Sequence, residues 1–134
     1  MEIRLLEGSA RVLQSRYEVI QAALREVLIS NSTLEGVSHR PKGTETLVPI
    51  GGDSYVKAEI SDSEQVIMGI GAGVCMEKKI EDSIAELKER QTELEKTRVS
   101  VEQQLGQILT QLENDRGRLN DFLRKKSGEN VEVV

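Results

Sequence analysis

The sequence predicts an α+β protein, a long antiparallel two-helix coiled coil with two β-hairpins inserted between the helices. Three observations predict this fold. Apolar residues recur at steps of three and four toward both ends of the chain, short alternating runs separated by glycines fill residues 44–76, and aromatic residues make up only 2% of the 134 residues. A chain so poor in aromatic side chains can fill a narrow seam between helices but hardly a thick globular core.

The first apolar series runs from Ile3 to Leu34, with Asn31 as its polar exception. Its alternating steps of three and four form a heptad pattern, which predicts a helix with one apolar seam. Glu35-Gly36 should end this helix, because glycine is favoured just past a helix end. The loop that follows contains Pro41 and leads into the first hairpin.

A second heptad series runs from Ile80 to Phe122, and no proline follows Cys75. Because both series step at about 3.5 residues, the helices should pair as a left-handed coiled coil. A β insert that returns the chain to its point of departure makes the pair antiparallel. One register places Leu34 near Ile84 and Leu6 near Leu112, and the registers one heptad to either side stay open.

In this register the first helix runs out opposite Asp115, so the apolar residues Leu119, Phe122 and Leu123 have no partner within the chain. Exposed apolar residues at one end of a helix pair are typical of a contact surface for another molecule. Disordered chain ends are the alternative interpretation.

The central stretch predicts two β-hairpins, since strand-like runs flank two glycine-rich turns. Two small hairpins leave strand edges unpaired and have little to pack against, so we expect them to complete a sheet or barrel with strands of other subunits. The predicted segments are an N-terminal helix over 1–36, a loop over 37–43, the hairpins over 44–76, a C-terminal helix over 77–127 and a flexible tail over 128–134.

Composition and charge exclude several functions. The net charge is −5 and the charges along the second helix are intermixed, which argues against nucleic acid as a partner. A single cysteine cannot form an intrachain disulfide and suits a reducing cytoplasm. No signal peptide is visible and no apolar run approaches the roughly 20 residues of a membrane span, so a membrane partner is not expected either.

No catalytic, cofactor-binding or metal-binding residues are predicted. Gly69-Ile70-Gly71-Ala72-Gly73 has the wrong glycine spacing for a dinucleotide-binding loop and suits a hairpin turn. His39 is the single histidine and Cys75 the single cysteine, which cannot supply four zinc ligands, and neither has a recognisable motif around it. A pocket formed around His39 and Cys75 would revive an enzymatic function.

The hairpin sequences T-L-V-P-I-G-G-D-S-Y-V-K-A-E-I at Thr46–Ile60 and V-I-M-G-I-G-A-G-V-C-M-E-K at Val66–Lys78 resemble the alpha-type subunits of the prefoldin family, of an archaeal kind. The order of helix, two hairpins and helix is similar over nearly the whole chain. The resemblance implies an ATP-independent chaperone, a hexamer of two alpha-type and four beta-type subunits. Coiled-coil tips in such a hexamer capture non-native polypeptides and deliver them to a group II chaperonin.

The resemblance also implies two sets of functional residues. The oligomerisation platform falls on the apolar residues of the hairpins: Leu47, Val48, Ile50, Val56, Ala58, Ile60, Val66, Ile67, Ile70 and Val74. Client binding falls on the helix tips: Ile3, Leu5, Leu6, Leu119, Phe122 and Leu123. The main alternative is a coiled-coil scaffold or adaptor subunit without chaperone activity, which would share this architecture but whose tips would not bind non-native chains.

Overall fold

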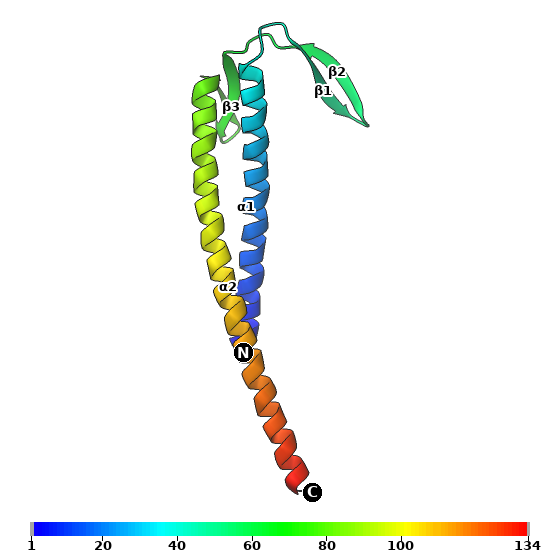
Figure 1. Cartoon of the computed structure of the whole chain (residues 1–134), viewed down its shortest axis with the longest axis vertical. Helices are drawn as coiled ribbons and strands as arrows, with labels where there is room; N and C mark the ends of the chain where they lie inside the picture. The colour runs from blue at the N-terminus through cyan, green and yellow to red at the C-terminus, as the bar shows by residue number, and fades with distance from the viewer. Residues whose placement is uncertain (1, 134) are drawn as a thin grey trace. The chain divides into compact units, whose positions relative to one another are not determined.

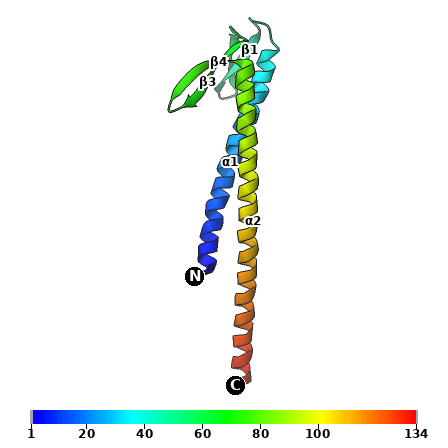
Figure 2. The ribbon, with the colours of Figure 1, turned by 90° about the vertical axis from the view of Figure 1, so that its left-hand side faces the viewer.

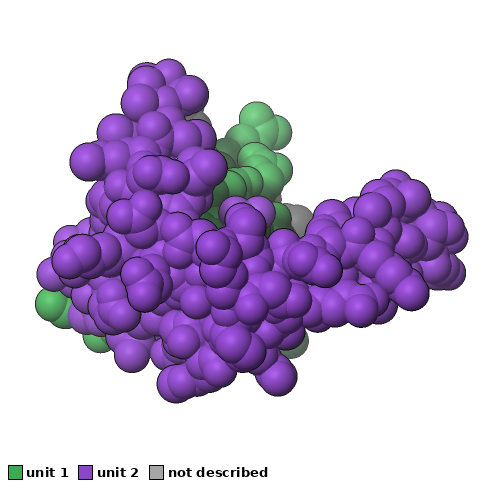
Figure 3. Space-filling model, turned by 90° about the horizontal axis from the view of Figure 1, so that it is seen from above, with its two compact units in different colours: residues 1–23, 94–134 green, residues 24–93 purple. Residues whose placement is uncertain are grey.

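The computed structural model describes residues 2–133, and the side chains of residues 2–127. Its elements follow in the order α1 (Glu2–Ser38), β1 (Glu45–Gly51), β2 (Ser54–Glu59), β3 (Gln65–Gly71), β4 (Val74–Lys79) and α2 (Ile80–Val133) (Figure 1). The predicted fold, two long helices with two hairpins between them, is confirmed. The chain divides into two compact units, residues 1–23 with 94–134 and residues 24–93 (Figure 3).

The heptad seams predict the buried side of both helices. Every seam position from Ile3 to Leu34 and from Ile80 to Asp115 is buried or half-buried, whereas Leu119 and Phe122 are exposed. Full burial of a leucine or isoleucine contributes on the order of 1.5–3 kcal/mol, so the seam stabilises the helices where intrinsic propensity alone is weak.

In the first unit, the N-terminal part of α1 packs antiparallel to the C-terminal part of α2 (Figures 1 and 2). Leu13, Val101 and Leu112 are buried there. Arg116 Nη2 donates a hydrogen bond to Glu7 Oε1 at 2.8 Å across the two helices. These two residues flank the seam at equivalent heptad positions.

The second unit contains the C-terminal part of α1, both hairpins and the start of α2. Leu24, Val27, Ile80 and Leu87 are buried in it. An ion pair between the two helices again flanks the seam, with Lys88 Nζ 3.6 Å from Glu35 Oε1.

The end of α1 differs from the prediction, because the helix passes through Gly36 and ends at Ser38. A glycine inside a helix costs about 1 kcal/mol relative to alanine but does not by itself stop the helix. The last turn is stabilised by a hydrogen bond from Ser38 Oγ to the carbonyl oxygen of Glu35 at 2.9 Å. Pro41 disfavours a helical conformation at Arg40, and the helix stops before it.

The start of α2 also differs, since the predicted helix begins at residue 77 and the observed one begins at Ile80. Glu77, Lys78 and Lys79 instead extend β4 and pair with β3. Sheet hydrogen bonds therefore override the helix propensity of these three residues, and Ile80 N–H donates to the carbonyl oxygen of Glu64 at 2.9 Å. At the other end, α2 continues to Val133, so the backbone is helical over most of the predicted flexible tail, and Val134 lies outside the described residues.

The four strands form two separate two-stranded antiparallel sheets. We call β1–β2 hairpin 1 and β3–β4 hairpin 2. Their turns need a left-handed backbone, with φ of 57° at both Gly52 and Asp53, and 51° and 75° at Ala72 and Gly73. Two successive positive φ values are the signature of the tight turn that matches the twist of a β-hairpin. The predicted glycine turns thus set the connection of both hairpins.

Candidate assembly surface and helix tips

Apolar side chains on the hairpins are largely open to solvent. Of the ten predicted platform residues, seven are exposed, namely Leu47, Val48, Ile50, Val56, Ile67, Ile70 and Val74. The other three, Ala58, Ile60 and Val66, are half-buried. Clustered exposed apolar residues on strands with free edges are typical of surfaces that another protein chain covers.

Two further apolar side chains share this surface and were missed by the sequence prediction. Tyr55 and Met76 are both more than half exposed. Tyr55 lies opposite Pro49 and Met76 opposite Met68 in the two ladders. Tyr55 lies on the same face as Lys57, so alternation alone could have placed it on an exposed face, whereas Met76 shares the face of the half-buried Val66 and Met68.

Hairpin 1 is connected to the rest of the second unit at its base, where two backbone hydrogen bonds close the hairpin. Gly43 N–H donates to the carbonyl oxygen of Ile60 at 2.7 Å, and Ile60 N–H donates to the carbonyl oxygen of Thr44 at 3.0 Å. Of the strand residues beyond this base, only Ala58 is half-buried. The strands project away from the C-terminal end of α1, which lies in the same unit (Figure 1).

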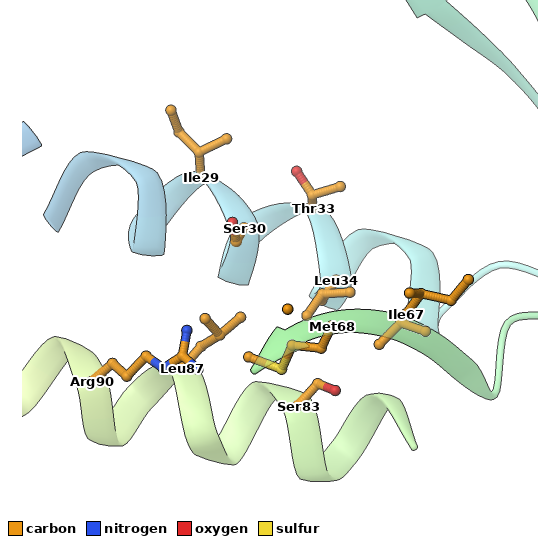
Figure 4. Close-up of a pocket in the computed structure, with 11 residues that line it drawn as sticks. Ile29, Ser30, Thr33, Leu34, Ile67, Met68, Ser83, Leu87 and Arg90 are labelled. Atoms are coloured by element: carbon orange, nitrogen blue, oxygen red, sulfur yellow. The ribbon is translucent and has the colours of Figure 1, made fainter. Parts of the chain in front are cut away.

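Hairpin 2 is attached differently, since the base of β3 packs against both helices within the second unit. Val66 and Met68 are half-buried, whereas Ile67, which lies between them and faces the other way, is 74% exposed. Met68 extends toward Leu87 of α2, and Leu34 of α1 borders the same space (Figure 4). The turn of this hairpin projects away from the helices (Figure 2).

The helix tips show a division among the six predicted client-binding residues. Leu5, Leu119, Phe122 and Leu123 are exposed, Phe122 by 62%. Ile3 and Leu6 are half-buried in the seam. Leu119 lines a groove together with Ile3, Asp115 and Arg118, so it lies at the end of the helix pair. Leu5, Leu119, Phe122 and Leu123 are thus the predicted tip residues that are open to solvent.

His39 and Cys75 are the two residues that the sequence raised as candidates for chemistry. Among the described residues, no group of three or more His, Cys, Asp or Glu side chains is arranged to hold a metal ion. The cavities beneath β3, along the helix seam and at the base of hairpin 1 are lined by residues other than His39 and Cys75, and Cys75 is exposed as a free thiol on β4. No helix in the described part of the chain combines the length and apolar character needed to cross a bilayer.

The sequence matches the family described as "Prefoldin subunit" over residues 6–116. This chain belongs to the prefoldin family. Its relatives are of the alpha type. Prefoldin subunit alpha of Methanopyrus kandleri is 35% identical over 104 residues, which cover 78% of this chain and 66% of that protein. Prefoldin subunit alpha of Methanocorpusculum labreanum is 29% identical over 128 residues, which cover 90% and 87%.

Prefoldin subunit alpha 1 of Thermococcus kodakarensis is 34% identical over 89 residues, and the match spans 66% of this chain and 61% of that protein. The chain thus spans slightly less than two thirds of the length of the Methanopyrus and Thermococcus relatives. A cryo-EM structure of filamentous PFD from Methanocaldococcus jannaschii has a TM-score of 0.70, with 87% of this chain and 96% of that chain covered. At 18% sequence identity this likeness shows the prefoldin fold.

The matches confirm the alpha-type prefoldin resemblance of the sequence. Prefoldins are chaperone subunits that assemble with other prefoldin subunits, and the family is not enzymatic. Within this alpha-type prefoldin chain, the hairpins and the helix tips are therefore the two surfaces to which a function can be assigned.

Proposed function

We propose that this prefoldin subunit acts in an ATP-independent holdase that captures non-native polypeptides at its helix tips. The observation that carries the proposal is that each of the two compact units exposes its own set of apolar residues. Seven platform residues are exposed on the hairpins, and four tip residues are exposed at the opposite end of α2 or the start of α1. One surface is available for assembly while the other stays open for a client.

The proposed assembly is a cytoplasmic hexamer of two copies of this alpha-type chain with four beta-type subunits. Each hairpin here forms its own two-stranded sheet, and a two-stranded sheet is marginally stable in water. Strands from neighbouring subunits would pair the free edges and cover Leu47, Val48 and Ile50. The assembled hairpins form the platform, and the helices extend from it.

The tips suit the capture of unfolded chains because aliphatic and aromatic contacts are weakly directional. Unfolded polypeptides present apolar patches of varied shape, which a rigid pocket would not fit. Several weak tips on one hexamer act together, since after the first contact the later ones become intramolecular. Release then needs no nucleotide, and the client passes to a group II chaperonin.

The test is suppression of the aggregation of an unfolded client by the reconstituted complex without nucleotide. Replacing Leu119, Phe122 and Leu123 by serine should reduce suppression severalfold, because the apolar contact area at the tip is removed. Leu109→Ser is the matched control, since Leu109 is 51% exposed on the same helix, as is Leu123.

Both variants should still assemble, as measured by native mass spectrometry. Suppression by the triple variant equal to that of the Leu109→Ser control would exclude the tips as the client-binding surface. Complexes that assemble fully but never suppress aggregation would instead favour a scaffold or adaptor function.

A further inference from the structure

A cluster of three charged side chains links hairpin 2 to α2. Lys78 on β4 donates a hydrogen bond from Nζ to Glu86 Oε2, and Arg90 Nη2 lies 3.3 Å from the other oxygen, Glu86 Oε1. The Lys78 and Glu86 side chains are 23% and 33% exposed. The ammonium of Lys78, helped by Arg90, holds the pKa of the Glu86 carboxyl below its usual range.

Apolar packing beneath hairpin 2 is incomplete. A cavity of ≈ 430 Å³ lies between β3 and the two helices, lined by Leu34, Met68, Ser83, Leu87 and Arg90 among others (Figure 4). Ser83 is fully buried, and its Oγ has no hydrogen-bond partner among the described atoms. Packing with a cavity and an unsatisfied hydroxyl holds an element less tightly than a filled core does.

Hairpin 1 has no such link in the described part of the chain. Among its described residues, an ion pair joins Lys57 Nζ to Glu45 Oε1 at 3.9 Å, within the hairpin and largely exposed. The two ladders have the same pairing pattern, with each position of hairpin 2 numbered 20 higher than its equivalent in hairpin 1. Lys78 is therefore the equivalent of Ala58. The charged link is thus a specific feature of hairpin 2.

We propose that Lys78, Glu86 and Arg90 form a positioning clasp that fixes hairpin 2 to α2 and presets the direction from which it meets a partner strand. Hairpin 1, which lacks a clasp, stays free to adjust its direction during assembly. The carboxylate uses both oxygens on two cations from different elements, and this geometry fixes direction better than apolar contact does. The inference rests on the proposed function in that hairpin 2 belongs to the assembly platform.

The test is amide hydrogen exchange on the full-length chain, with residues 45–59 as internal reference for residues 65–79. Glu86→Lys places three cations together and should accelerate exchange in hairpin 2 by roughly two- to fivefold, the range expected for losing a partly exposed ion pair. A released two-stranded hairpin opens readily. The swap Lys78→Glu with Glu86→Lys restores an attractive pair and should return most of the protection.

Lys57→Glu is the matched control, because it breaks the ion pair of hairpin 1 and should leave hairpin 2 unchanged. Glu86→Gln removes the charge without adding repulsion and should increase the exchange rate of hairpin 2 by less than Glu86→Lys. It replaces Glu86→Lys in the test if that variant fails to fold. Unchanged exchange in hairpin 2, equal acceleration in both hairpins, or no recovery in the swap would each overturn the clasp.

Assembly is measured separately by native mass spectrometry with a beta-type partner. If the variants change exchange as expected but the chain forms no complex with a beta-type partner, the clasp stands and the proposed function is contradicted. A complex that forms while Glu86→Lys leaves exchange unchanged would contradict the clasp alone.

Discussion

Hairpin 1 and hairpin 2 have the same backbone pairing but differ in how they contact the helices. Their ladders have the same cross-strand pattern, a register shift at the same place and the same two-residue turn. On one face, hairpin 1 has the pairs Thr46–Ala58 and Val48–Val56, where hairpin 2 has Val66–Lys78 and Met68–Met76. The longer side chains of hairpin 2 reach the helices. The local sequence thus determines that a hairpin forms. The length of the side chains on one of its faces determines whether the hairpin packs against the helices.

The largest expected effect comes from a charge on hairpin 1. Val48→Asp should abolish assembly, because a carboxylate would be buried without a partner between subunits. The helices should persist, since Val48 is exposed within the chain. Val99→Asp is the matched control, because Val48 and Val99 are both 45% exposed. Native mass spectrometry and circular dichroism check this, and a complete complex with Val48→Asp would remove hairpin 1 from the platform.

A smaller effect is expected when hairpin 2 receives the residues of hairpin 1. The variant Val66→Thr, Met68→Val and Lys78→Ala should raise amide exchange of residues 65–79 toward that of residues 45–59. Two of the side chains that reach the helices are shortened, and the third, at residue 66, becomes polar. Ile67→Leu copies Leu47 on the opposite, exposed face and should change nothing. If the triple variant kept its protection, side-chain length would not explain the docking.

The smallest effect should come from the turns. Ala72 has a φ of 51°, where hairpin 1 has Gly52 with a φ of 57°. Because a left-handed conformation costs an alanine about 1 kcal/mol, Ala72→Gly should slow exchange in hairpin 2 by a few-fold at most. Gly51→Ala, at a φ of 101°, should do the opposite in hairpin 1. An acceleration by Ala72→Gly would mean that chain entropy outweighs the strain of the turn.

The heptad seam and the hairpin turns were predictable because each depends on residues near in sequence. The steps of three and four identify the buried positions of both helices, and the glycines identify both turns. The boundaries were less predictable. Gly36 does not stop α1, and Glu77–Lys79 extend a strand because pairing with β3 outweighs their helix propensity.

The docking of hairpin 2 could not be predicted, because it depends on side-chain contacts between strands and helices that the pattern of neighbouring residues does not show. The ion pair of Lys78 with Glu86 spans a strand and a helix, and a polar residue such as Ser83 is fully buried beside β3 without any signal in its neighbours. The unequal lengths of the predicted helices left Leu119, Phe122 and Leu123 without a partner, and the full set of tip residues came from the resemblance to prefoldins. Their division into exposed Phe122 and half-buried Ile3 needed the structure.

The central claim is that these hairpins are incomplete sheets that neighbouring subunits finish. Native mass spectrometry of the chain mixed with a beta-type prefoldin subunit, combined with amide exchange across residues 45–79, tests it most directly. We predict a complex of two copies of this chain with four partners, in which the hairpin amides become strongly protected. A chain that stays monomeric beside its partner, with hairpin amides already as protected as the helix seam, would contradict the account.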